Sequence, residues 1–84
     1  MAWVIENAMK NNRRQCELCK RESFITLKGE PYLEVHHVIP LSQNGPDEIS
    51  NAVALCPACH RELHFGRDKD KLQQQLYAQI KRLK

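Results

Sequence analysis

The sequence predicts a small α+β domain. Three observations support this: the chain has only 84 residues, its four cysteines form two short pairs, and its four histidines gather beside strand and helix signals. A chain of this length buries little apolar surface, so a disulfide or a bound metal often stabilises it. We therefore expect one domain over residues 1–84 that is held together by its cysteines.

The cysteines are arranged as two Cys-x-x-Cys pairs, Cys16 with Cys19 and Cys56 with Cys59. Two such pairs far apart in a sequence are typical of a structural zinc site with four thiolate ligands. Residues 1–15 show neither a long apolar run nor a cleavage signature, so we expect a reducing, cytoplasmic environment that favours zinc over disulfides. A redox-active thiol protein is an alternative, although it needs only one of the two pairs.

The charge balance limits how the chain can attract nucleic acid. The formal net charge is +3, and four thiolates around one Zn²⁺ ion lower it to about +1. Attraction for a polyanion must therefore come from a local basic patch and not from the overall charge. No segment approaches the length of a membrane span, so we expect no membrane partner.

The N-terminal half predicts a helix followed by strands. Residues 2–11 are expected to be helical because Val4 and Ala8 fall on one face. A weak alternation over residues 23–28 predicts a strand, and the apolar pattern of residues 32–36 predicts another.

The next segment predicts a second strand that pairs back across a loop. Residues 44–47 (NGPD) are a strong loop signal, and residues 49–55 suit the returning strand. Pro57 suits the first position of a helix, and Gly66 can close that helix as a left-handed cap.

A last helix is expected at the C-terminal end of the sequence. Asp68 can cap its N-terminus. One apolar stripe follows at helical spacing, consisting of Leu72, Leu76, Ile80 and Leu83. We expect this stripe to cover the core, and a dimer surface is the alternative.

The four histidines form two pairs that can face each other. His60 and His64 lie one helical turn apart, so their side chains project from the same face. His36 and His37 lie near a strand end, where both can reach one centre only if the chain bends away. This arrangement favours a metal site with one histidine left free. Solvent-exposed histidines, or a core histidine bonded to the backbone, are the alternatives.

This stretch resembles the HNH nuclease motif, also called the ββα-metal fold, in which two strands with a long loop between them precede a helix. The matching positions are His37, Pro40, Asn44-Gly45, Asn51, His60 and His64. Residues 33–37 (LEVHH) are similar to the double-histidine segment of colicin-type DNases, and the run CPACHREL resembles the zinc-bearing HNH domains of restriction-type nucleases. The resemblance covers roughly residues 16–66. It implies a small ββα-metal (HNH) core with a four-cysteine zinc knuckle and flanking N- and C-terminal helices.

The resemblance also implies a role for each matching side chain. Three histidines would hold one divalent ion: His36, His60 and His64. His37 would be the general base that takes a proton from the attacking water, and Asn51 would hold His37 in place through backbone hydrogen bonds. Glu34 would orient one of the histidine ligands, unless it is an ordinary solvated strand residue.

The implied activity is metal-dependent hydrolysis of double-stranded DNA by a single-metal mechanism that leaves 5′-phosphate and 3′-hydroxyl ends. Three imidazole ligands favour Mn²⁺, Co²⁺, Ni²⁺ or Zn²⁺ over Mg²⁺. We expect nicking or weakly specific cleavage, because the sequence contains no long basic arm. A zinc-stabilised module that binds nucleic acid without cutting it and an RNA-directed nuclease are the alternatives.

Basic side chains around the motif are candidates for contact with DNA: Arg14, Lys20, Arg61 and Arg67. Arg61 lies beside His60, and Arg67 follows the expected helix. Clustered charges also occur on ordinary solvated surfaces, so the pattern alone does not decide between the two. It also leaves open a homodimer and a fused or separate targeting domain.

Overall fold

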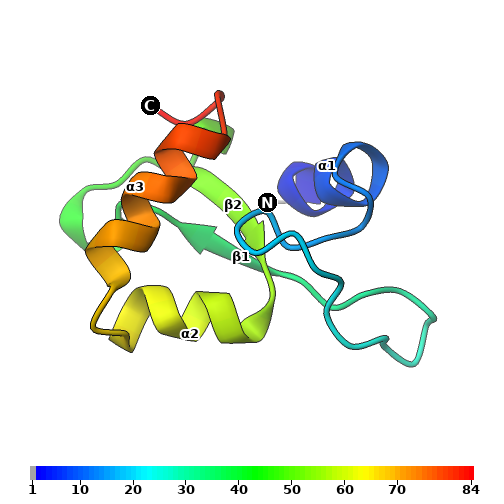
Figure 1. The fold of residues 1–84 in the computed structure, drawn as a ribbon. Helices are drawn as coiled ribbons and strands as arrows, with labels where there is room; N and C mark the ends of the chain where they lie inside the picture. Colours follow the sequence, from blue (N-terminus) through cyan, green and yellow to red (C-terminus); the bar gives the residue numbers. More distant parts are fainter. Residues whose placement is uncertain (1) are drawn as a thin grey trace.

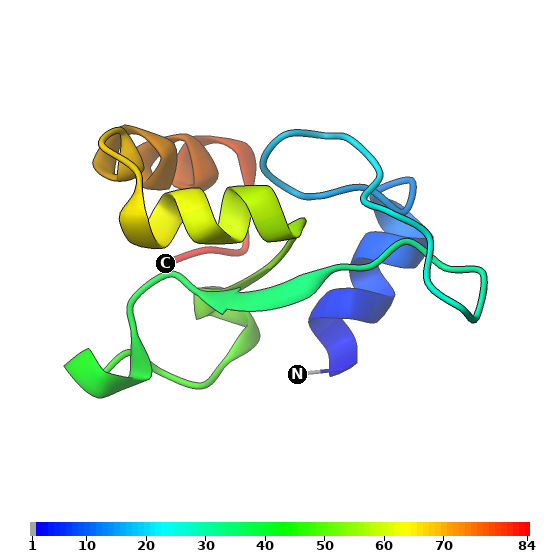
Figure 2. The same ribbon diagram turned by 90° about the horizontal axis from the view of Figure 1, so that it is seen from below.

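Two short antiparallel strands lie at the centre of the structure, a computed structural model that describes residues 2–84. The elements follow the chain in this order: α1 (Ala2–Asn11), β1 (Glu34–His37), β2 (Ala52–Leu55), α2 (Pro57–Phe65) and α3 (Lys69–Gln79). Helices α1 and α2 contact the strands from opposite sides, and α3 packs on α2 (Figures 1 and 2). The α+β fold expected from the sequence is therefore confirmed. No helix within residues 2–84 is long and apolar enough to cross a membrane.

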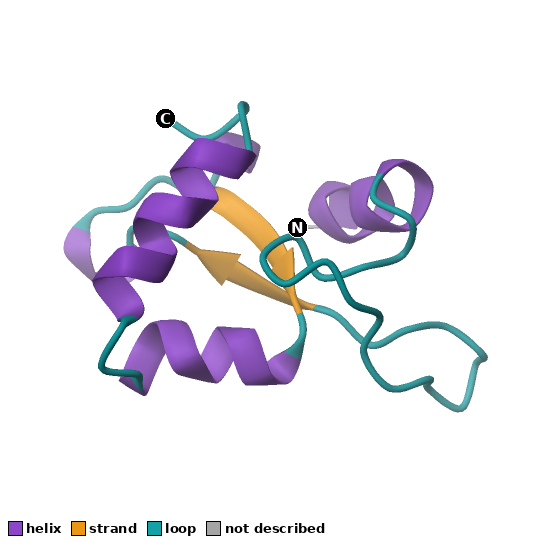
Figure 3. Cartoon of the chain, viewed as in Figure 1, coloured by secondary structure: helices purple, strands orange, loops and turns teal. Residues whose placement is uncertain are grey.

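The two strands have the sequential ββα connection that the sequence predicts, but both are shorter than expected. Glu34 of β1 faces Leu55 of β2, and His37 faces Ala52. The second strand begins only at Ala52 because residues 49–51 form a short 3₁₀ turn before it. All four residues of β2 are buried, because α1 and α2 cover the strands from opposite sides (Figure 3).

The predicted strand over residues 23–28 is wrong. The segment makes only one isolated bridge, between Ile25 and Pro31, and it turns at Gly29, whose φ is +82°. It projects from the body of the molecule as a loop (Figures 1 and 2). Alternating apolar residues form a strand only when a neighbouring strand pairs with them, and Leu27 is instead fully exposed.

Both predicted helix caps also differ from expectation. Gly66 ends α2 with φ −74° and ψ 149°, which is extended and not left-handed. A glycine is still required there, because an added Cβ would lie 2.6 Å from the carbonyl oxygen of Glu62. Asp68 precedes α3 but its side chain makes no capping hydrogen bond.

The C-terminal apolar stripe covers the core, as predicted. Leu76 of α3 is fully buried, and Ile80 and Leu83 are buried as well. Because α3 ends at Gln79, Ile80 and Leu83 reach the core from the irregular chain that follows the helix. They share this core with Val4 of α1 and with the residues of β2.

A buried ion pair, which the sequence did not reveal, ties three distant segments together. Both carboxylate oxygens of Glu17 accept hydrogen bonds from the guanidinium of Arg82, at 2.7 and 2.9 Å. Glu17 also accepts a bond from the amide of Ala54 in β2. Arg82 donates further to the carbonyl oxygens of Ile49 and Ala52. The pair therefore joins the cysteine knuckle, the start of β2 and the C-terminal segment.

Candidate functional site

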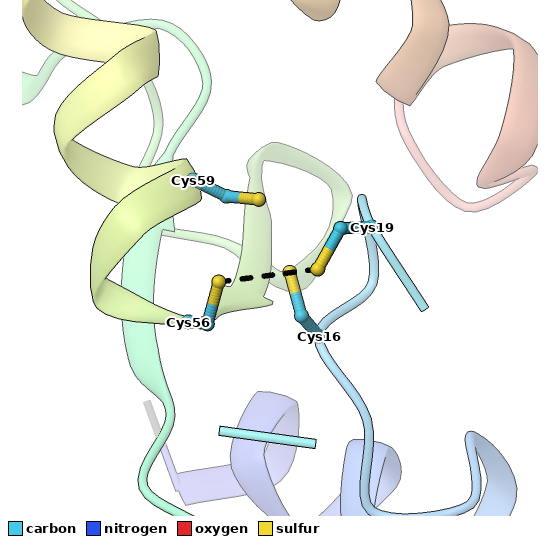
Figure 4. A group of neighbouring side chains, drawn as sticks. All are labelled: Cys16, Cys19, Cys56 and Cys59. Atoms are coloured by element: carbon cyan, nitrogen blue, oxygen red, sulfur yellow. Dashed lines mark hydrogen bonds between the residues drawn. The ribbon is translucent and has the colours of Figure 1, made fainter. Parts of the chain in front are cut away.

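The four cysteines converge between the knuckle that follows α1 and the start of α2 (Figure 4). Their sulfur atoms all lie within 4.8 Å of one another, and those of Cys19 and Cys56 are 4.0 Å apart. A tetrahedral zinc ion with bonds of about 2.3 Å separates neighbouring sulfurs by about 3.8 Å. The cluster of free thiols therefore fits a zinc ion with small movements of the side chains.

The pKa shifts of these thiols indicate that a bound cation would help to ionise them together. Burial, together with the neighbouring Cys16, raises the pKa of Cys59 far above the usual range of a thiol. Burial also raises the pKa of Cys19. Burial opposes ionisation of Cys16 too, but backbone N–H groups outweigh it and lower the pKa of this thiol. Thiolates of this kind become favourable together only around a positive ion, which suits a closed structural site better than a reactive thiol.

Three histidines from two elements form a second cluster. His36 comes from β1, and His60 and His64 come from the face of α2 that lies over β1. Ring nitrogens of the three lie within 4.8 Å of one another, and the ring centroids are 5.0 to 5.1 Å apart. An ion bound at about 2.1 Å would need nitrogens roughly 3.4 Å apart. The three rings are therefore close enough together to be candidate ligands of one ion.

His36 is suited to ligation by its protonation state. Its side chain is only 7% exposed. Burial, and then the nearby His60 and His64, lower the pKa of His36 to about 4. The ring is therefore neutral at physiological pH and keeps a lone pair for a metal ion.

Glu34, predicted to orient a histidine, lies against His60. Its Oε1 is 2.8 Å from Nδ1 of His60, and its other oxygen accepts a hydrogen bond from the Tyr32 hydroxyl. The hydrogen bond to His60 is the main cause that lowers the pKa of Glu34. With Nδ1 engaged by the carboxylate, His60 presents Nε2 toward the cluster.

His37 lies beside the three clustered histidines. Together with His36, His60 and His64 it lines a hollow of about 260 Å³. Its Nε2 is 2.8 Å from Oδ1 of Asp47. The sequence indicates Asp47 only as part of a loop signal and does not predict this contact.

Asn51 is buried and bonded entirely to backbone, as predicted. Its side-chain oxygen accepts from the amide of Ile39, and its nitrogen donates to the carbonyl oxygens of Ile39 and Pro46. These three bonds, of 2.9 to 3.0 Å, tie the chain after His37 to the loop before β2.

The four candidate DNA-binding residues lie in different parts of the molecule. Arg61 is exposed on α2 close to Glu34, whose carboxylate it helps to keep ionised, and Arg67 is exposed just after that helix. Arg14 instead donates to the carbonyl oxygen of Gly29 in the projecting loop, at the opposite end of the molecule from the α2–α3 junction (Figures 1 and 2). Lys20 contacts the side chain of Asn12.

A second hollow, of about 280 Å³, adjoins the histidine cluster, and part of its lining consists of polar side chains that the sequence did not indicate. His36 and His64 line it together with the polar side chains of Gln43, Lys69, Asp70 and Gln73, and the apolar Val38, Pro40 and Leu63 complete the lining. Lys69 and Gln73 belong to α3, which places that helix beside the cluster.

The chain is similar to restriction enzymes. It is 48% identical, over 98% of its length, to the Type IV methyl-directed restriction enzyme EcoKMcrA of Escherichia coli (strain K12), of which it spans 28%. Among solved structures, it superposes on the Type IV phosphorothioation-dependent restriction endonuclease ScoMcrA with a TM-score of 0.73 and 34% identity, covering 94% of this chain and 18% of that one. The modification-dependent TagI restriction endonuclease gives a TM-score of 0.59 with 31% identity, over 77% of this chain and 23% of the other.

The family match coincides with the segment that holds both clusters. Residues 16–66, from the first cysteine to the end of α2, match the HNH endonuclease family. This is the segment for which the sequence had indicated that resemblance. The chain belongs to the HNH endonuclease family.

Proposed function

We propose that the chain is the catalytic domain of a DNA endonuclease that hydrolyses phosphodiester bonds with one divalent metal ion. The observation that carries the proposal is the convergence of His36, His60 and His64 with His37 beside the same hollow. The family match and the similarity to restriction enzymes support the same conclusion. The products would carry 5′-phosphate and 3′-hydroxyl ends.

The three clustered histidines would bind the ion. His36 offers a neutral imidazole, and Glu34 orients His60 so that Nε2 faces the cluster. Three protein ligands leave coordination positions open for substrate, and the bound ion stabilises negative charge that develops on the phosphate oxygens. Imidazole ligands favour Mn²⁺, Co²⁺, Ni²⁺ or Zn²⁺ over Mg²⁺.

His37 would act as the general base. It lines the hollow beside the three ligands without belonging to the cluster, so its free ring nitrogen can take a proton from water that attacks phosphorus. A histidine is suited to this task near neutral pH. Asn51 would act through the backbone, because its three hydrogen bonds fix the chain at Ile39, two residues after His37.

The four-cysteine site would have a structural role. Cys56 and Cys59 lie at the start of α2, while His60 and His64 lie further along the same helix. A zinc ion held with Cys16 and Cys19 would fasten the helix to the knuckle and thereby fix the direction in which its histidines point.

Double-stranded DNA would approach over the two hollows that adjoin His36 and His64. Lys69 lines one of these hollows beside Asp70, and Arg61 and Arg67 are exposed on and just after α2, so these three basic side chains would contact phosphates. Arg14 and Lys20 would contact DNA only if the duplex also reached the knuckle. Few groups here can read base edges, so we expect nicking or weakly specific cleavage. Because the chain spans only 28% of the Escherichia coli relative, recognition of modified DNA would belong to other parts of such longer proteins.

The test is cleavage of supercoiled plasmid across a series of divalent metals. We expect nicking by the wild type with Mn²⁺ or Ni²⁺, and loss of nicking in His37→Ala with retained DNA binding. Lys81→Ala, an exposed residue after α3, is the control and should cut normally. Binding without cutting by the wild type would favour the nucleic-acid-binding module, and stronger cleavage of a competing RNA would favour an RNA-directed nuclease.

A further inference from the structure

We propose that Asp47 is a positioning residue for His37, and that its carboxylate holds the imidazole in the tautomer that carries its proton on Nε2. Nδ1 then remains unprotonated and can accept a proton. The inference rests on the proposed function, in which His37 is the general base. It adds a residue that neither the sequence pattern nor the comparisons indicate.

The hydrogen-bond chemistry determines the tautomer. Oδ1 of Asp47 lies 2.8 Å from Nε2 of His37. An ionised carboxylate can only accept hydrogen bonds, and a neutral imidazole carries one N–H group. For a neutral His37 beside an ionised Asp47, this contact requires the proton on Nε2 and leaves the lone pair on Nδ1.

The contact is held in place by Asn51. The buried amide of Asn51 bonds both backbone groups of Ile39, two residues after His37. The same amide donates to the carbonyl oxygen of Pro46, the residue immediately before Asp47. One side chain thus fixes the segments that carry both the imidazole and the carboxylate.

The loop that carries Asp47 is also packed closely against the end of β1. The amide of Gly45 donates to the carbonyl oxygen of Pro40 at 3.0 Å. A Cβ at Gly45 would lie only 1.9 Å from the carbonyl oxygen of Ile39, so the approach requires glycine. Although the side chain of Asp47 is exposed, its backbone is therefore tied to the strand that carries His37.

Two histidine–carboxylate contacts in the described residues have the same length but use different ring nitrogens. Glu34 engages Nδ1 of His60, whereas Asp47 engages Nε2 of His37, both at 2.8 Å. His60 is therefore arranged to present Nε2, and His37 to present Nδ1. The two carboxylates thus leave a different ring nitrogen available on each histidine.

The expected effect is moderate because the Asp47 side chain is 68% exposed and solvent screens its charge. Asp47→Asn and Asp47→Ala should each lower kcat about three- to tenfold, with KM for plasmid nearly unchanged. Asn can accept from Nε2–H or donate to Nε2, so this variant should populate both tautomers.

The experiment combines kinetics with nitrogen-15 NMR of the protein that carries one equivalent of zinc for the four-cysteine site and no further divalent metal. The His37 signals are assigned by their loss in His37→Ala. Wild type should show the Nε2–H tautomer, Asp47→Asn should show a mixture, and kcat should fall. Glu48→Gln is the matched control, because Glu48 is the next carboxylate along and contacts Ser50 instead. It should leave both readouts unchanged.

The proposal is overturned if Asp47→Asn keeps the wild-type tautomer, or if the tautomer changes while kcat does not. Failure of the proposed function gives a different result, namely undiminished cleavage by His37→Ala. The tautomer measurement does not depend on activity, so the two failures can be told apart.

Discussion

Replacing Arg82 with methionine should destabilise the domain strongly, although this residue lies far in the sequence from both the cysteine and the histidine clusters. Arg82 forms the ion pair with Glu17 that is described above. The Glu17 side chain is 6% exposed, so its carboxylate depends on this positive partner. Arg82→Met would leave that carboxylate buried with a single remaining donor, the amide of Ala54. It would also remove the donor from the carbonyl oxygens of Ile49 and Ala52.

The magnitude follows from the burial of the pair. Removing one partner of a buried ion pair costs about 3–5 kcal/mol, because the other charge is left uncompensated. The Arg82 side chain is 19% exposed, so water can partly solvate the vacated space, and the lower end of that range is expected. A domain of this size has a total unfolding free energy of about 5–15 kcal/mol, so the loss would be a large fraction of it.

Urea unfolding in excess zinc measures the effect, since a fixed zinc concentration keeps the contribution of metal binding constant. Lys81→Met is the matched control, because Lys81 is adjacent and exposed, and it should change stability by less than about 0.5 kcal/mol. The double variant with Glu17→Gln should be more stable than Arg82→Met alone, because a neutral amide replaces the stranded charge. A loss in Arg82→Met no larger than that in Lys81→Met would refute the reasoning.

Three further predictions concern the two clusters and the backbone between them. Cys59→Ala should lose tightly bound zinc, as measured by metal analysis, and most of its helical circular dichroism. The reason is that structural zinc contributes about 10–16 kcal/mol to the folding of such small domains. A folded, zinc-free variant would contradict the structural role. Glu34→Gln should weaken Mn²⁺ binding about 10- to 100-fold, as measured by calorimetry. The control Glu30→Gln, in the projecting loop, should bind Mn²⁺ normally. Equal Mn²⁺ affinities of the two variants would show that Glu34 does not orient His60. Asn51→Ala removes three hydrogen bonds from a buried site and should lose about 1–3 kcal/mol of stability together with nicking activity. The control Ser50→Ala should retain both. Full activity in Asn51→Ala would contradict the proposed role of Asn51 in holding His37.

The spacing of residues in the sequence predicts the structure correctly where the geometry depends only on neighbouring residues. The i, i+4 spacing of His60 and His64 placed both rings on one face, and the structure has them there. Pro57 marked the first residue of α2 correctly. The strand prediction for residues 23–28 was wrong because a strand needs a neighbouring strand to pair with, and the local pattern carries no information about that partner.

Long-range contacts between charged groups were not predictable in the same way. Asp47 reaches His37 across ten residues, and Arg82 reaches Glu17 across 65. Nothing in the spacing of either pair distinguishes them from ordinary solvated charges. Both depend on backbone positions that are set only after β1, β2 and the C-terminal segment have packed together.

The order of residues along α2 links the two clusters mechanically. Cys59 and His60 are adjacent, so a metal ion bound by the cysteines at the start of the helix would constrain the residue that begins the histidine face. His64 lies one turn further along, and no cysteine restrains that end. Loosening the cysteine site should therefore displace both imidazoles together relative to His36, which β1 holds independently. Zinc bound at the four-cysteine site would then orient His60 and His64 as well as stabilise the fold, so removing it would abolish both effects together.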